Sequence, residues 1–161
     1  HLDAHMVHQA LHQMSLDNID VLFIENVGNL VCPASFDLGQ HINVALLSVP
    51  EGDDKPAKYP VMFRSVDAVL LSKTDLLEVL PEFSPQRAEA ALRGLASDAP
   101  LLNVHIRSEE GIRPWLDWLR EQLAGFKSSN RSRFRPLPVG AHALTHPQPH
   151  PHQFTPREND G

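Results

Sequence analysis

The sequence predicts an α/β fold with a mostly parallel sheet flanked by helices. Four short, mostly apolar runs are typical of strands that are buried on both faces. Segments with apolar residues at helical spacing lie between or beside these runs. Buried strands that alternate with helices favour a parallel sheet. Because ligands bind such sheets at the carboxyl ends of the strands, the polar residues that follow each run are the first candidates for a site.

The individual elements follow from this pattern in chain order. A helix is expected over Leu2–Met14, where apolar residues recur at helical spacing. The apolar runs expected as strands lie at 21–24, 42–49, 66–71 and 101–106. A helix between the last two begins with Ser84 as N-cap and Pro85 in the first helical position. A final helix is expected after Gly111, with an apolar stripe over Ile112–Leu123.

Composition excludes several classes of protein. The 161 residues have a formal net charge of −6, which argues against a nucleic-acid surface as the main function. No run approaches the ~18 apolar residues of a membrane span, and no signal peptide is evident, which predicts a cytoplasmic chain. The single cysteine, Cys32, excludes an internal disulfide.

The composition changes near residue 125. Residues 1–125 form the predicted domain. Residues 126–161 are rich in proline and histidine and poor in large apolar side chains, so we expect this tail to be disordered. The tail is either a linker or a loose nickel binder through its histidines, which are His142, His146, His150 and His152.

Ser72-Lys73-Thr74-Asp75 follows the third apolar run. The carboxylate of Asp75 can accept hydrogen bonds from the N1–H and N2–H₂ edge of guanine, and the aliphatic stem of Lys73 can lie along the base. Ser108 belongs to the loop after the next run, which could offer backbone N–H groups to the guanine carbonyl. The competing interpretation is an ordinary capped turn from a strand into a helix.

Glu25 follows the first apolar run and is a candidate Mg²⁺ ligand, directly or through water. Gly28 would let the backbone approach a terminal phosphate. The alternative is a plain strand end with a turn glycine.

Farther on, Cys32 pairs naturally with His1, because thiolate and imidazole suit Zn²⁺ or Ni²⁺. Two ligands from one chain are too few for a closed tetrahedral site.

Histidines also recur along the first predicted helix. His1, His5, His8 and His12 can line one helix face. That face is either a metal-handling stripe or a solvated surface opposite the apolar side. We interpret His8 and His12 as part of a solvated surface.

Longer blocks of sequence resemble a known family. The blocks are HLDAHM (1–6), ENVGNLVCPASFDLG (25–39), EGDDKP (51–56), KYPVMF (58–63), SKTDLL (72–77) and WLDWL (115–119). Together they are similar to the HypB family of hydrogenase nickel-incorporation proteins, which are SIMIBI-class GTPases with a three-layer P-loop fold. The resemblance runs from His1 to about Leu123, and the block at 25–39 is its most specific part.

The resemblance implies binding of GTP or GDP with Mg²⁺, GTP hydrolysis, and a Ni²⁺ or Zn²⁺ site. It implies that guanine is recognised by Ser72, Lys73, Asp75 and Ser108. The family often has Asn at the position of Ser72, and this departure predicts weaker nucleotide binding. The resemblance also implies that Asp3 lies near the γ-phosphate and Mg²⁺, that Glu25 stands at the Mg²⁺ switch, and that Gly28 lies on the phosphate side. It also implies that His1 and Cys32 are metal ligands.

Two family features are absent from these 161 residues. No glycine is followed by Lys, so the phosphate loop G-x-x-x-x-G-K-S/T does not occur, and no cysteine precedes His1 as it does in the family. We therefore expect a fold without its first strand and phosphate loop, and no GTP turnover by this chain alone.

The partners implied by the resemblance are a second copy in a homodimer with the metal site at its interface, other nickel-hydrogenase maturation factors and the hydrogenase large subunit. Three alternatives stay open. They are a non-enzymatic metal-binding and docking module, a related SIMIBI ATPase, and a Rossmann-like domain with another ligand.

Overall fold

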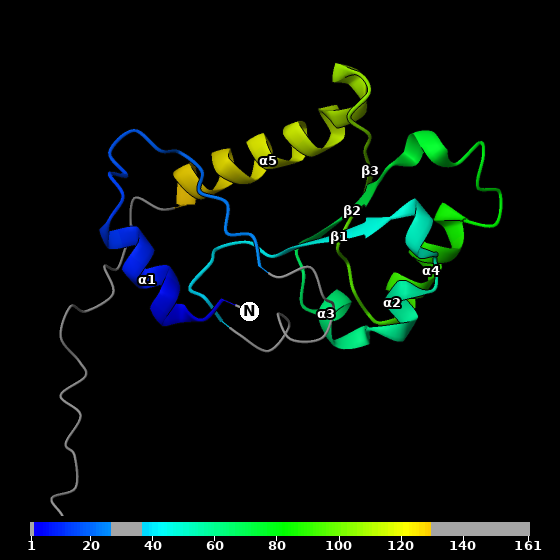
Figure 1. Ribbon diagram of the computed structural model, residues 1–161, viewed down its shortest axis with the longest axis horizontal. Coiled ribbons are helices and arrows are strands. Elements are labelled where there is room, and N and C mark those ends of the chain that lie inside the picture. The colour runs from blue at the N-terminus through cyan, green and yellow to red at the C-terminus, as the bar shows by residue number, and fades with distance from the viewer. Residues whose placement is uncertain (1, 27–36, 130–161) are drawn as a thin grey trace, which may run out of the picture. The chain divides into compact units, whose positions relative to one another are not determined.

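The computed structural model describes residues 2–26 and 37–129 (Figure 1). The chain forms two compact units, His1–Leu123 and Ala124–Gly161. Of the second unit, the structure describes only the end of one helix, up to Ser129.

The first unit is built on a parallel sheet, as the sequence predicts. The sheet has three strands in the order β1 (Val44–Ser48), β2 (Ala68–Ser72) and β3 (Leu101–Asn103). Ser48 pairs with Ser72, and Leu71 pairs with Asn103, so all three strands end at the same edge. β3 is shorter than the predicted run.

The central strand carries the core. Ala68–Leu71 of β2 are all buried, which explains why this run is wholly apolar. Leu47 and Leu71 pack with Phe63 and Leu92, and each of these four side chains is fully buried. Burial of a side chain of this size contributes about 1.5–3 kcal/mol. The helices that supply the covering residues are α2 (Lys55–Lys58), α3 (Pro60–Arg64) and α4 (Pro85–Gly94).

α4 begins where the sequence places it. The Ser84 hydroxyl accepts a hydrogen bond from the Arg87 N–H at 3.2 Å, which satisfies a donor that the helix itself leaves free. The Asp53 carboxylate accepts from the Ser84 N–H at 2.7 Å and pairs with Arg87 at 2.7 Å. Asp53 follows the short helix η2 (Val49–Glu51), so these contacts tie the start of α4 to the turn after β1.

Helix α1 (Ala4–His12) confirms the first predicted helix and buries Val7. The last helix, α5 (Glu109–Ser129), starts just before Gly111 and continues past residue 125, so residues 126–129 are helical where a disordered tail was predicted. Gln122, Ala124 and Lys127 keep the local composition compatible with a helix. The remaining tail, 130–161, lies outside the described residues. Among the described helices, none combines the length and apolar character that crossing a membrane requires.

The prediction of a strand at 21–24 is wrong. These residues form no strand in the described part of the chain, and the sheet ends at β1. Leu22 is exposed and Phe23 is 66% exposed, so the run is not buried on both faces. A strand forms only where a neighbouring strand bonds to its backbone N–H and C=O groups. The sequence of an apolar run does not show whether such a neighbour exists. The Phe23 ring instead lies 6.3 Å from the ring of Trp115 in α5.

Candidate functional site

The shared carboxyl edge of the strands carries the residues predicted to recognise guanine. Ser72 is the last residue of β2, and its hydroxyl donates to the Leu47 carbonyl at 3.3 Å. This bond braces β2 against β1. The serine found where the HypB family often has asparagine therefore has a structural partner of its own.

Lys73 has an unusual backbone conformation. Its φ of 59° and ψ of 37° lie in the left-handed region, which costs a residue with a Cβ about 1–2 kcal/mol. The next residue holds this bend in place, because both the N–H and the hydroxyl of Thr74 bond to the Val104 carbonyl, at 3.2 and 3.1 Å. Strain that the surroundings maintain in this way is typical of functional sites. The bend places the exposed Lys73 side chain directly at the end of β2.

Asp75 lies in the short helix η3 (Thr74–Leu76), and its side chain is only 21% exposed. Its carboxylate is 2.6 Å from the Nε atom of Arg107, in the loop after β3. A guanidinium presents paired N–H donors to a carboxylate, as the N1–H and N2–H₂ edge of guanine also does. At this edge of the sheet, the Asp75 carboxylate is thus paired with a charged N–H donor.

Arg107 was not predicted from the sequence. It follows β3, whereas Asp75 follows β2, and only the parallel pairing of the two strands brings them together. The only sequence signal for this ion pair is a basic residue just after β3, the strand next to β2.

Ser108 closes the loop that leads into α5. The Gly111 N–H donates to the Ser108 carbonyl at 3.2 Å and is 3.3 Å from its hydroxyl oxygen, and the His105 N–H donates to the Gly111 carbonyl at 3.0 Å. The pKa of Glu110 lies below its ordinary value of 4.5. Hydrogen bonds from its own backbone N–H and from Ser108 lower it, and the nearby charge of His105 adds to this effect. The loop is held at its base, while Ile106 at its tip is 92% exposed. Its backbone can therefore meet a ligand from solvent.

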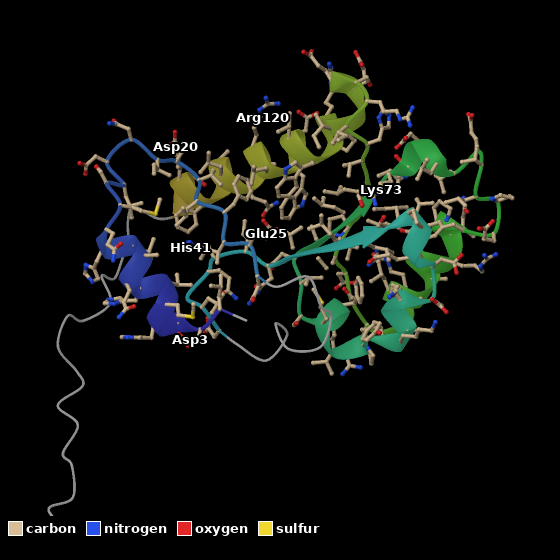
Figure 2. The ribbon with its side chains drawn as sticks, viewed as in Figure 1. Asp3, Asp20, Glu25, His41, Lys73 and Arg120 are labelled. Carbon is tan, nitrogen blue, oxygen red and sulfur yellow. The ribbon has the colours of Figure 1, made fainter. Side chains whose placement is uncertain are left out.

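Asp3 and Glu25 are the two residues predicted to lie near Mg²⁺. Asp3 is the N-cap of α1, and its carboxylate accepts from the Met6 N–H at 2.9 Å. The Leu2 N–H donates to the Asn26 side chain at 3.0 Å, which joins the start of α1 to the segment that holds Glu25. Both carboxylates are exposed. Glu25 does not follow a strand as predicted, and Figure 2 shows Asp3 at the start of helix α1.

His1, Gly28 and Cys32 lie outside the described residues, so their predicted roles stay predictions. Within the described ranges, no group of three or more His, Cys, Asp or Glu side chains is arranged to hold a metal ion. His5, His8 and His12 are exposed on α1, which fits both a solvated face and a metal-handling stripe.

Comparison with known proteins agrees with the fold. The profile of the family described as "CobW/HypB/UreG, nucleotide-binding domain" matches residues 1–103. Among curated proteins, the chain is 52% identical over 124 residues to the hydrogenase maturation factor HypB of Azotobacter vinelandii, covering 76% of this chain and 40% of that protein. It is 48% identical over 122 residues to HypB of Escherichia coli K12, covering 76% of this chain and 42% of the relative. The chain thus spans less than half the length of these relatives.

Two solved structures share the fold. A crystal structure of HypB from Helicobacter pylori in complex with nickel has a TM-score of 0.71 and 39% identity, covering 78% of this chain and 60% of that one. HypB from Archaeoglobus fulgidus has a TM-score of 0.69 and 36% identity, covering 76% and 59%. The chain belongs to the CobW/HypB/UreG family of nucleotide-binding domains, and the relatives that it resembles within this family are HypB maturation factors.

Proposed function

We propose that this chain is the guanine-recognising part of a GTPase that serves nickel insertion during nickel–iron hydrogenase maturation. The family is a nucleotide-binding one, similar proteins are named hydrogenase maturation factors, and a similar structure was solved with nickel. Hydrolysis of GTP by the intact protein would control a nickel or zinc site at a dimer interface. The proposed setting is the cytoplasm, with other maturation factors and the hydrogenase large subunit as partners.

The observation that carries the proposal is the environment of Asp75. A carboxylate that is four-fifths covered lies at the carboxyl edge of a parallel sheet and binds a guanidinium at 2.6 Å. This is the edge at which sheets of this type bind ligands. Guanine offers paired N–H donors there, whereas adenine lacks that donor pair, so one aspartate supports selectivity for guanine.

The neighbouring residues complete the proposed base site. The Lys73 stem lies along the base, Ser72 braces the strand beneath it, and the loop of Ser108 presents backbone N–H groups to the guanine carbonyl. Glu25 and Gly28 serve Mg²⁺ and the phosphates, with Asp3 in a switch near the γ-phosphate. Catalysis is positioning plus electrostatics, and hydrolysis releases the ordered switch segments. Because the phosphate loop supplies most of the phosphate contacts, we propose that this chain alone does not turn over GTP.

The proposed metal site uses His1 and Cys32. Thiolate and imidazole suit Ni²⁺ or Zn²⁺, and a symmetric pair of chains would supply four ligands. Metal analysis of Cys32→Ser beside a chain without residues 130–161 tests this. Loss of nickel only on removal of the tail would assign binding to the tail histidines instead.

The base site is tested by titrating the chain with GDP, XDP and ADP. Asp75→Asn should weaken GDP binding about 10- to 100-fold, because a charge-assisted hydrogen bond contributes about 1.5–3 kcal/mol. The same change should favour XDP, since an amide offers one donor and one acceptor to the xanthine edge. Asp98→Asn is the control, because Asp98 is exposed and precedes β3 at the opposite edge of the sheet. Equal binding of ADP and GDP would favour a related ATPase, and unchanged GDP binding by Asp75→Asn would remove Asp75 from the site.

A further inference from the structure

The exposed face of α1 brings two histidines into contact. The Nε2 atoms of His8 and His12 are 3.1 Å apart, and their rings meet edge to face with centroids 4.3 Å apart. They are four positions apart in the sequence, so one helical turn places them on the same face. Val7 anchors the helix on its other side, where it is buried. The two imidazoles therefore form a cluster that neither the base site nor the proposed His1 and Cys32 site uses.

The spacing of these nitrogens is that of two ligands on one ion. Imidazole nitrogens bind Zn²⁺ at about 2.0–2.1 Å. Two of them at neighbouring positions of a tetrahedral or square arrangement are then about 3 Å apart by simple triangle geometry. The observed 3.1 Å falls in this range. The same spacing of two histidines along a helix holds zinc in HExxH metalloenzymes.

The contact seen in the structure is a hydrogen bond between the two rings. An Nε2–Nε2 hydrogen bond requires one ring to donate a proton and the other to accept it. When the donating ring carries its proton on Nδ1 instead, both Nε2 lone pairs are free to bind one divalent ion, after small rotations of two exposed side chains. His12 is also the last residue of α1, where the helix dipole favours a positive charge.

We infer that His8 and His12 form a two-imidazole binding site for a borderline divalent transition ion such as Ni²⁺, Zn²⁺ or Cu²⁺. Imidazole suits these ions, whereas Mg²⁺ and Ca²⁺ prefer oxygen ligands. No third His, Cys, Asp or Glu among the described residues completes the site, so water fills the other coordination positions. A site with open positions exchanges its ion readily, which suits capture and transfer better than storage. It is independent of the proposed site at His1 and Cys32.

The test measures Ni²⁺ and Zn²⁺ binding to the full metal-free chain by calorimetry. The double variant His8→Gln/His12→Gln should lose one bound equivalent, while His146→Gln/His150→Gln, which removes two tail histidines at the same spacing, should keep it. Glutamine is a good helix former, so α1 is retained, and circular dichroism checks this. Cys32→Ser should also keep this equivalent, which separates the chelate from the proposed interface site.

The single variants distinguish a chelate from two independent imidazoles. If both nitrogens hold one ion, His8→Gln and His12→Gln should each weaken binding nearly as much as the double variant, by about tenfold or more, because coupled ligands are strongly non-additive. A second readout uses the unmodified chain: less than one equivalent of paramagnetic Ni²⁺ should broaden the ring signals of His8 and His12 before those of His5. Full binding by the double variant, additive losses in the single variants, or broadening of His5 before His8 and His12 would each overturn the inference.

Discussion

The guanidinium of Arg107 lies 2.6 Å from the Asp75 carboxylate and so occupies the group proposed to select guanine. Arg107 is 74% exposed and reaches Asp75 from the loop after β3. A base that bonds to Asp75 must therefore displace this side chain or share the carboxylate with it. If Asp75 binds the base as proposed, the ion pair makes Arg107 a competitor of the nucleotide.

Arg107→Ala should strengthen GDP binding. An exposed ion pair contributes about 0–1 kcal/mol, so its removal should raise the affinity by up to about fivefold. Arg120→Ala is the matched control, since it removes a comparable exposed pair with Asp117 at 3.0 Å on α5. Fluorescence titration with labelled GDP measures the effect. A loss of affinity would show that Arg107 contacts the nucleotide instead of competing with it.

Lys73→Gly should stabilise the fold while weakening nucleotide binding. Glycine accepts the left-handed conformation of residue 73 without the Cβ penalty, which predicts a gain of about 1 kcal/mol. The same change removes the stem proposed to lie along the base. Urea denaturation and GDP titration measure the two effects.

Ala96 provides the control for that variant. It also has a positive φ, 55°, but it follows α4 and lies far from the base site in sequence. Ala96→Gly should give a similar gain in stability and leave GDP affinity unchanged. If Lys73→Gly also leaves affinity unchanged, the Lys73 stem does not contact the base.

Glu110 should make the start of α5 sensitive to acid. Its pKa is lowered in the folded chain, chiefly by a hydrogen bond from its own backbone N–H and then by Ser108. A lowered folded pKa means that its contribution is fully present above the unfolded pKa, near 4.5, and is lost as the pH falls through the folded value.

Glu110→Gln should therefore lower the urea midpoint at pH 6, and the difference from the unmodified chain should shrink as the pH falls below about 4.5. Glu121→Gln, exposed on the same helix, corrects for the general effect of removing a carboxylate. A difference that stays constant with pH would assign the effect to something other than the Glu110 charge.

Local signals in the sequence were sufficient for much of the fold. The cap formed by Ser84 and Pro85 acts within a few residues, so the start of α4 was predicted correctly. The wholly apolar run of β2 identified the central strand for the same reason. The short helices α2 and α3 were missed, because four or five residues give too little periodicity to recognise.

The parts that were not predicted depend on distant contacts. Whether 21–24 pairs as a strand depends on a neighbour, and whether Arg107 meets Asp75 depends on the register of β2 with β3. In the site, the positions of Lys73 and Asp75 followed from the strand end. The 3.1 Å contact of His8 with His12 needed side-chain geometry that helical spacing alone cannot supply.

Gly111→Ala should be strongly destabilising, although its position is helical. A Cβ atom at Gly111 would lie 2.5 Å from the His105 carbonyl oxygen and would also meet the His105 ring. The His105 carbonyl cannot move away easily, because the His105 N–H donates a hydrogen bond to the Gly111 carbonyl at 3.0 Å. Overpacking of this kind costs about 1–3 kcal/mol.

Gly125→Ala is the matched change on the same helix. A Cβ there meets nothing within 4 Å, so the better helix propensity of alanine should stabilise the chain by up to about 1 kcal/mol. The two variants should thus move the urea midpoint in opposite directions. Gly111→Ala should also weaken GDP binding, because moving His105 shifts the loop that carries Arg107 and Ser108. Equal midpoints for the two variants would show that the contact between His105 and Gly111 does not hold this loop.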